Sequence, residues 1–324
     1  MATPAPYGAL FPGQGSQYPG MARVLVDEFS WTRAIYEEAS DAIQENLLRL
    51  CLDGPEDRLQ LTQNAQPAIL ATSHAWFQVL RRTLDFSPAA GAGHSLGEYT
   101  ALLCAGSLEL ATAVRLVRKR GELMQAAVPA GKGRMAALIG PTEDQVKRLC
   151  EQASQGETSI VVPANYNGPG QTVIAGHAEA VQRAEKLAGP EGDPSLKARK
   201  VVPLKVSAPF HSPLMHPAAD AFQPYLTAVR WAERAFPIVH NLDATWRTSG
   251  DLPPLLRDQI DHPVLWTQCQ AELGRRGLGL FVETGPGKVL SGLGKRILEG
   301  ARFHSVDGLD ALRDLETLFK EQAK

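Results

Sequence analysis

Short runs of apolar or small residues alternate along this chain with longer segments of helical periodicity. The run Tyr7–Phe11 predicts a first strand, and Pro88–Gly93 predicts another. A helical pattern begins at Leu96, and a second one covers Glu109–Val128. Because strands that alternate with helices are typical of an α/β protein, we expect a largely parallel sheet with helices on both faces.

The segment from about Ala130 to Val206 has a pattern of its own. Its elements follow the order strand, helix, strand, strand, helix, strand, which is the ferredoxin-like βαββαβ arrangement. The expected elements are Met135–Ile139, Glu143–Ala153, Ile160–Ala164, Thr172–Ala175, Ala178–Leu187 and Val201–Val206. Beyond Pro213 helices again alternate with short strands such as Leu278–Val282, so we expect the chain to return to the larger sheet.

The composition excludes several classes of function. The 324 residues, 44% of them hydrophobic, suffice for one or two compact domains. Lys and Arg number 33 against 35 Asp and Glu, and this near balance argues against a nucleic-acid partner. No run of about 18 apolar residues could span a membrane, and the first residues lack the pattern of a secretory signal. We therefore expect a cytoplasmic protein, and nothing in the sequence demands more than a monomer.

The cysteines and histidines give no metal or disulfide signal. The four cysteines are far apart and form no C-x-x-C pair, which argues against a disulfide framework and a zinc site. His211 and His216 do not have a helical ligand spacing, and no G-x-x-x-x-G-K-[ST] phosphate loop occurs. We expect no metal and no cofactor.

The sharpest chemical signal is the G-x-S-x-G motif Gly93–Gly97, between a predicted strand and a predicted helix. Its glycines permit a tight turn that exposes Ser95, and the following helix start offers backbone N–H groups to an oxyanion. A chance match in a glycine-rich turn is the alternative, and the strand–turn–helix setting disfavours it. Together with the element order, the motif predicts an α/β-hydrolase-like large domain (residues 1–129 and 207–324) with an inserted ferredoxin-like small domain (residues 130–206).

A serine hydroxyl needs a base to take its proton, and His211 is the best candidate among the eight histidines. It lies within Pro209–Pro213, where two prolines disfavour regular structure and hold the chain at the edge of an element. His94 adjoins the serine but shares its turn, so its side chain should diverge. His74 and His240 fit equally well as core or surface residues.

Five sequence segments follow one another in a diagnostic order. They are FPGQGSQ (Phe11–Gln17), GHSLGEY (Gly93–Tyr99), RKRGELMQ (Arg118–Gln125), PFHSPLM (Pro209–Met215) and ETGPGKVL (Glu283–Leu290). With them the chain resembles the malonyl-CoA:acyl carrier protein transacylases, from about Tyr7 to its end. The resemblance implies transfer of a malonyl group from malonyl-CoA to the phosphopantetheine thiol of an acyl carrier protein.

The resemblance implies Ser95 as nucleophile, His211 as its base and Arg120 as the clamp for the malonyl carboxylate. A guanidinium can hold a carboxylate through two parallel hydrogen bonds, whereas a neutral acyl group would leave its buried charge unpaired. Without the resemblance, Arg120 would be interpreted as part of a solvated basic run that starts at Arg115.

The resemblance also implies supporting residues. The backbone N–H groups of Leu96 and Gln14 are the implied oxyanion donors, and such a donor contributes about 3–4 kcal/mol in serine enzymes. The main-chain carbonyl of Gln259 is implied to orient the histidine, since no acidic residue between serine and histidine occupies a recognisable triad position. Asn165 and Asn167 match a loop at the rim of the cleft between the domains, where they either shape the acyl pocket or act as turn formers.

Other functions fit parts of the pattern. An esterase or thioesterase shares the serine turn, but Arg120 and the inserted segment argue against it. A trans-acting polyketide synthase acyltransferase or an editing acyl hydrolase would share the family motifs, although a hydrolase would not need the carboxylate clamp. A non-catalytic carrier-binding module would be expected to lack Ser95 or His211. Fatty acid and polyketide pathways both remain open.

Candidates for docking the acidic carrier are Lys288, Lys295 and Arg296.

Overall fold

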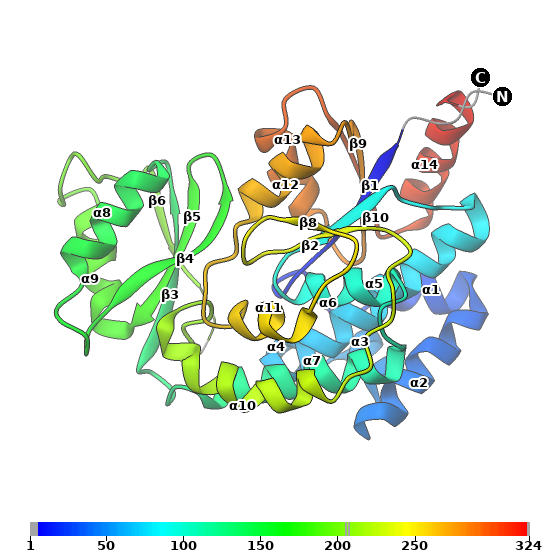
Figure 1. Ribbon diagram of the computed structural model, residues 1–324, viewed down its shortest axis with the longest axis horizontal. Coiled ribbons are helices and arrows are strands. Elements are labelled where there is room, and N and C mark those ends of the chain that lie inside the picture. Colours follow the sequence, from blue (N-terminus) through cyan, green and yellow to red (C-terminus); the bar gives the residue numbers. More distant parts are fainter. Residues whose placement is uncertain (1–5, 205, 207, 323–324) are drawn as a thin grey trace.

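The computed structural model describes residues 6–204, 206 and 208–322, in which the strands form two separate sheets (Figure 1). The larger sheet contains β1 (Tyr7–Phe11), β2 (Ala90–Gly93), β7 (Ile238–Val239), β8 (Trp246–Arg247), β9 (Leu280–Thr284) and β10 (Arg302–Val306). Their order is β10-β9-β1-β2-β7-β8. All neighbours are parallel except the edge pair β7 and β8, which is antiparallel. The predicted α/β class is confirmed, and the sheet is mixed.

Helices cover both faces of the larger sheet, because its central strands are apolar on both sides. In β1, Ala9 and Phe11 belong to one core cluster, whereas Leu10 belongs to the other. The helices of this part are α1 (Arg23–Glu28), α2 (Arg33–Ile43), α3 (Leu47–Asp53), α4 (Glu56–Gln60), α5 (Thr62–Leu84), α6 (Leu96–Cys104), α7 (Leu110–Ala126), α10 (His216–Thr227), α11 (Leu252–Asp258), α12 (Trp266–Arg275), α13 (Val289–Ile297) and α14 (Leu309–Gln322). No helix in the described ranges is both long and apolar enough to cross a membrane.

The second sheet is antiparallel and lies beside the first, with two helices on its far side (Figure 1). Its elements are β3 (Gly133–Ile139), α8 (Glu143–Ala153), β4 (Val161–Gly168), β5 (Gln171–His177), α9 (Ala178–Ala188) and β6 (Lys200–Pro203). The strand order is β4-β5-β3-β6. Leu138 of β3, Val146 of α8 and Val181 of α9 share a core cluster that is separate from those of the larger sheet.

Two expectations for this segment need correction. The strand expected at Ile160–Ala164 continues to Gly168, because β4 keeps pairing with β5 past two irregularities in register. Asn165 and Asn167, expected in a loop, therefore lie on a strand. The strand expected at Val201–Val206 ends at Pro203. Residues 205 and 207, at the expected domain boundary, lie outside the described residues.

The packing of α13 on β10 gives a stability prediction. A Cβ on Gly294 would lie 2.1 Å from Cε1 of Phe303, whose ring stacks on Phe281 with centroids 4.9 Å apart. Gly294→Ala should lower the free energy of unfolding by about 1–3 kcal/mol, the usual cost of overpacking. Gly292→Ala, in the same helix but facing open space, should raise it by about 0.5–1 kcal/mol through helix propensity. Denaturant unfolding followed by circular dichroism measures both, and equal effects would contradict this packing.

Candidate active site

Ser95 lies in the sharp turn between strand β2 and helix α6. Its backbone has φ 50° and ψ −104°, which residues other than glycine rarely adopt. The flanking glycines make the turn possible, because a Cβ on Gly93 would lie 1.9 Å from the main chain of Gly97. A Cβ on Gly97 would lie 2.1 Å from the carbonyl oxygen of Phe11. The G-x-S-x-G spacing therefore lets α6 start directly against the ends of the central strands.

His211 approaches the serine from the segment before the short 3-10 turn Pro213–Met215. Its Nε2 lies 2.7 Å from Ser95 Oγ, and its Nδ1 lies 2.8 Å from the main-chain oxygen of Gln259. Because a carbonyl only accepts, the proton of the neutral ring is on Nδ1, and Nε2 is left to accept the serine proton. Burial, and then the charge of Arg120, lower the pKa of His211 to about 3. The ring is therefore neutral near neutral pH and available as a base.

Arg120 reaches the same hydroxyl from helix α7, and it is only 1% exposed. Its Nη2 donates to Ser95 Oγ at 3.0 Å and to Gln259 Oε1 at 2.9 Å. Its Nη1 donates to Gln66 Oε1 at 3.0 Å, and its Nε has no hydrogen-bond partner among the described residues. A buried guanidinium with an unused N–H beside a serine hydroxyl is suited to bind a carboxylate.

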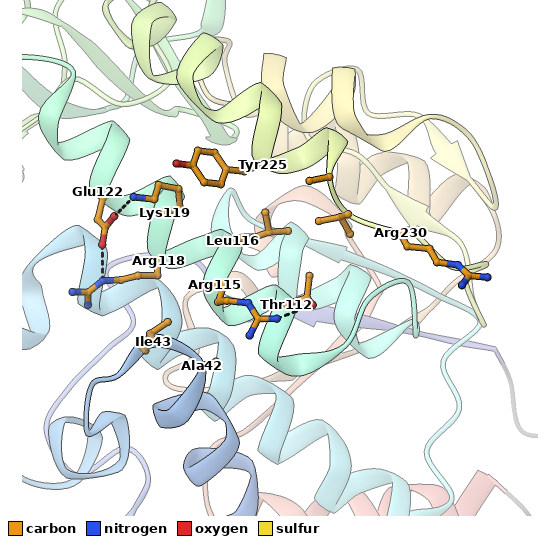
Figure 2. Close-up of a pocket in the computed structure, with 12 residues that line it drawn as sticks. Ala42, Ile43, Thr112, Arg115, Leu116, Arg118, Lys119, Glu122, Tyr225 and Arg230 are labelled. Carbon is orange, nitrogen blue, oxygen red and sulfur yellow. Dashed lines mark hydrogen bonds and ion pairs between the residues drawn. The ribbon is translucent and has the colours of Figure 1, made fainter.

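The neighbouring basic residues of α7 face a different surface. Figure 2 shows Arg115, Arg118 and Lys119 around a groove of about 600 Å³ on the outer side of this helix. Glu122 pairs there with Arg118 at 3.0 Å and with Lys119 at 2.7 Å. Arg120 is therefore separate from this basic run, which was the alternative interpretation of its sequence context.

Ser95, His211 and Arg120 line a cavity of about 110 Å³, far smaller than the roughly 300–1,000 Å³ of pockets for drug-sized ligands. Gln14, Leu96 and Asn165 line it as well, as do Gln66, His94, Met124, Met135, Leu204, Val206 and Phe210. Since Met135 and Asn165 belong to the antiparallel sheet, the cavity lies where the two sheets meet.

Asn167 is not among the residues that line this cavity. Its Oδ1 lies 2.7 Å from Nε2 of His94, the residue directly before Ser95. This contact links the His94 ring to β4, and His94 itself lines the cavity, so the divergence of its side chain from Ser95 stays a prediction. The sequence therefore found both asparagines near the site, but only Asn165 lines the cavity.

Three polar residues around the site were missed from the sequence. Gln66, which accepts from Arg120, is a polar interruption in the otherwise apolar run Ala65–Ala71, and this signal was available. Glu98 directly follows the G-x-S-x-G motif Gly93–Gly97 and is 1% exposed. Asn241 accepts from the Ser95 N–H at 2.6 Å through its Oδ1, and no local pattern marks it.

The remaining candidates are exposed basic residues at the two ends of α13. Lys288 precedes α13, and Lys295 and Arg296 lie in its last turn. Arg296 Nη2 donates to Oε1 of Gln171 in the antiparallel sheet at 2.6 Å. Within the described ranges, no group of three or more His, Cys, Asp or Glu side chains could hold a metal ion.

Comparisons with known proteins identify the family of this chain. A family model described as acyl transferase domain matches residues 10–262. The malonyl CoA-acyl carrier protein transacylase of Escherichia coli strain K12 is 42% identical over 294 residues, which make up 90% of this chain and 93% of that protein. The crystal structure of malonyl-CoA:acyl carrier protein transacylase from Xanthomonas oryzae pv. oryzae matches with a TM-score of 0.92 at 39% identity, over 98% of this chain and 99% of the other.

A second solved structure is described as a type II PKS acyl-carrier protein in complex with its malonyl-transacylase. It matches with a TM-score of 0.91 at 39% identity, over 97% of this chain and all of the other. These matches extend over nearly the whole chain and confirm the resemblance that its five motifs indicated. The chain therefore belongs to the acyl transferase family, among the malonyl-CoA:acyl carrier protein transacylases.

Proposed function

We propose that this protein transfers a malonyl group from malonyl-CoA to the phosphopantetheine thiol of an acyl carrier protein, through a malonyl ester on Ser95. The observation that carries the proposal is the 3.0 Å distance between Arg120 Nη2 and Ser95 Oγ. A short acyl group that ends in a carboxylate can be bound to Ser95 Oγ while its carboxylate accepts hydrogen bonds from Arg120. The relatives are named malonyl transacylases, and one was solved with a carrier protein, which supports this donor and this acceptor.

In the first half-reaction, Ser95 Oγ attacks the thioester carbonyl carbon while its proton passes to Nε2 of His211. Gln259 accepts from Nδ1–H and stabilises the ring as it becomes positively charged. The developing oxyanion accepts hydrogen bonds from the backbone N–H groups of Leu96 and Gln14, each worth about 3–4 kcal/mol to the barrier. The carbon–sulfur bond then breaks, and coenzyme A leaves as a thiol with the proton from His211.

The second half-reaction runs the same steps in reverse order with a different thiol. The phosphopantetheine thiol gives its proton to His211 Nε2 and attacks the carbonyl carbon of the malonyl ester. The carbon–oxygen bond to Ser95 breaks, and the proton returns to its Oγ. The products are malonyl-carrier and the free enzyme, so no redox change and no net proton transfer occur.

The carboxylate clamp determines which acyl groups are accepted. A malonyl carboxylate satisfies the Nε–H of Arg120, which has no partner among the described residues, whereas an acetyl group leaves it unpaired in a buried site. Asn165 borders the acyl group within a cavity that excludes long chains. An editing hydrolase would gain nothing from such a clamp, which favours the transferase over that alternative.

Exposed basic residues at the two ends of α13 fit the acidic carrier. We assign this docking role to Lys288, Lys295 and Arg296, which lie on and next to α13. The four cysteines are buried and unpaired, which supports a cytoplasmic location because free thiols persist in reducing compartments.

We also propose the finer fold description that the sequence indicated. Residues 130–206 form a ferredoxin-like domain, inserted between residues 1–129 and 207–324 of an α/β-hydrolase-like domain. The βαββαβ element order and the separate core of the antiparallel sheet support the first domain. A largely parallel sheet with a serine turn between strand and helix supports the second.

The intermediate can be tested by intact mass after brief mixing with malonyl-CoA or acetyl-CoA. The native chain should gain one malonyl group from malonyl-CoA, and Ser95→Ala should gain none because the nucleophile is gone. Arg120→Ala should form the adduct roughly 100-fold more slowly, since it loses the carboxylate clamp. Arg115→Ala, on the outer side of the same helix, is the matched control and should react like the native chain. Equal malonyl and acetyl adducts on the native chain would refute the malonyl assignment.

The low pKa of His211 predicts an unusual pH dependence. Its neutral form is the base, so lowering its pKa to about 3 keeps the base active far below its ordinary value of 6.5. The rate constant of adduct formation should change less than about two-fold between about pH 7 and pH 5, measured by quenched mixing and mass. A fall centred near pH 6.5 would contradict this prediction.

The lowered pKa of His211 also makes the folded protein less stable as the pH falls. The unfolded chain binds a proton on His211 below about pH 6.5, whereas the folded chain binds it only below about pH 3. The free energy of unfolding contributed by the neutral ring should therefore be complete above about pH 6.5 and decline as the pH falls toward 3. Circular dichroism at each pH is the control that the protein stays folded during the rate measurements.

A further inference from the structure

A buried polar cluster lies behind the Ser95–His211 pair. We define the support cluster as Glu98, His240, Asn241 and the side-chain amide of Gln259, all of which are at most 1% exposed. The reaction described above assigns no chemical step to these side chains. Buried polar groups are costly unless they are fully hydrogen-bonded, so their arrangement needs an explanation.

Glu98 is the centre of the support cluster and carries a negative charge. Its Oε1 accepts from His240 Nδ1 at 2.6 Å, and its Oε2 accepts from the Asn241 N–H at 3.0 Å and from Gln259 Nε2 at 2.8 Å. Nη1 of Arg234 lies 3.3 Å from His240 Nε2, and a guanidinium can only donate. His240 Nε2 is therefore an acceptor and Nδ1 carries the proton, which makes the ring neutral and the carboxylate anionic.

Gln259 connects this anion to the Arg120 cation. Its Oε1 accepts from Arg120 Nη2 at 2.9 Å, while its Nε2 donates to Glu98 Oε2. The orientation of this amide is fixed, because a guanidinium only donates and a carboxylate only accepts. The two buried charges are thus one amide apart, so Glu98 offsets the charge of Arg120 without a direct ion pair that would occupy its N–H groups.

The support cluster also holds the nucleophile turn on both sides. Asn241 Oδ1 accepts from the Ser95 N–H at 2.6 Å, and its Nδ2 donates to the carbonyl of Gly93 at 2.8 Å. Gln259 Nε2 donates to the carbonyl of Ser95 at 3.0 Å. Glu98 fixes both Asn241 and Gln259, so three of the hydrogen bonds that hold this strained turn depend on one carboxylate.

We propose that Glu98 is a positioning residue that acts through Asn241 and Gln259 to fix Ser95, the carbonyl that orients His211, and the guanidinium of Arg120. For malonyl transfer this inference rests on the proposed function, because only a carboxylate substrate uses the guanidinium. For the reactivity of Ser95 the inference does not rest on the proposed function, because Glu98 positions the serine and the histidine whichever acyl group is bound. Two substrates can therefore separate the two proposals.

The test compares Glu98→Gln with Glu283→Gln. Glu283 is a matched control because it is 0% exposed and accepts from the N–H groups of Leu290 and Ser291 at 3.0 and 2.8 Å. Quenched mixing and intact mass give the rate constant and the final amount of the Ser95 adduct with saturating malonyl-CoA. The same measurement with p-nitrophenyl acetate, an acyl ester without a carboxylate, gives the reactivity of the serine alone.

Glu98→Gln should lower both rate constants by roughly ten- to a hundred-fold while the adduct still reaches one group per chain. Glu283→Gln should remain within about two-fold of the native chain. A merely structural role gives the opposite signature, because partial unfolding lowers the final amount and leaves the rate constant of the folded fraction unchanged.

The outcomes separate the two proposals. If the native chain reacts with the ester but refuses malonyl-CoA, the malonyl function fails, while slowing of the ester reaction by Glu98→Gln still supports the positioning role. An unchanged rate constant in Glu98→Gln, or equal slowing in Glu283→Gln, overturns the positioning role, and a native serine inert to both substrates contradicts both proposals. If Glu98→Gln does not fold, Glu98→Asp keeps the charge but retracts it by one methylene, and a native rate constant in that variant would also overturn the inference.

Discussion

Taking the Arg120 guanidinium out of water costs on the order of several kcal/mol unless protein groups replace its hydration. Burial lowers the pKa of Arg120, and the nearby Tyr99 and Glu98 act in the opposite direction. The groups that replace this hydration come from α5, the serine turn and the segment after α11. These elements must therefore meet at the guanidinium. The same charge acts with burial to lower the pKa of His211. The proposed clamp therefore adds to the effect of burial in keeping the His211 ring neutral.

A site built this way must hold its parts in conformations that the chain would otherwise avoid. Ser95 and His211 both have positive φ, 50° and 58°, although neither is a glycine. Such strain persists only where the surroundings over-determine the backbone. Gln259 provides much of that constraint, because its main-chain oxygen accepts from His211 and its amide contacts Ser95 and Arg120. One residue therefore contacts Ser95, His211 and Arg120, the three groups of the proposed mechanism.

The sequence revealed those parts of the site that depend on local backbone geometry. The glycines of Gly93–Gly97 marked the serine turn, and alternating elements predicted the α/β class. Residue roles such as that of Arg120 came from the family resemblance, since its basic neighbours on α7 look the same in the sequence. Glu98 and Asn241 stayed hidden because their contacts join positions 142 or more residues apart. The path of β4 was also missed, because bulges interrupt its strand periodicity.

That same strand explains how the antiparallel sheet takes part in a site built mainly on the larger one. The main chain of β4 meets the segment after α11 directly: Val264 N–H donates to the carbonyl of Ala164 at 2.9 Å, and Tyr166 N–H donates to the carbonyl of Val264 at 3.0 Å. Asn165 lies between these two bonds and lines the cavity. Since Gln259 precedes Val264 on the same segment, one short stretch of chain fixes both the wall of the cavity and the carbonyl that accepts from His211. A shift of the antiparallel sheet would therefore disturb His211 as well as the cavity, which favours a rigid junction over a hinge at this point.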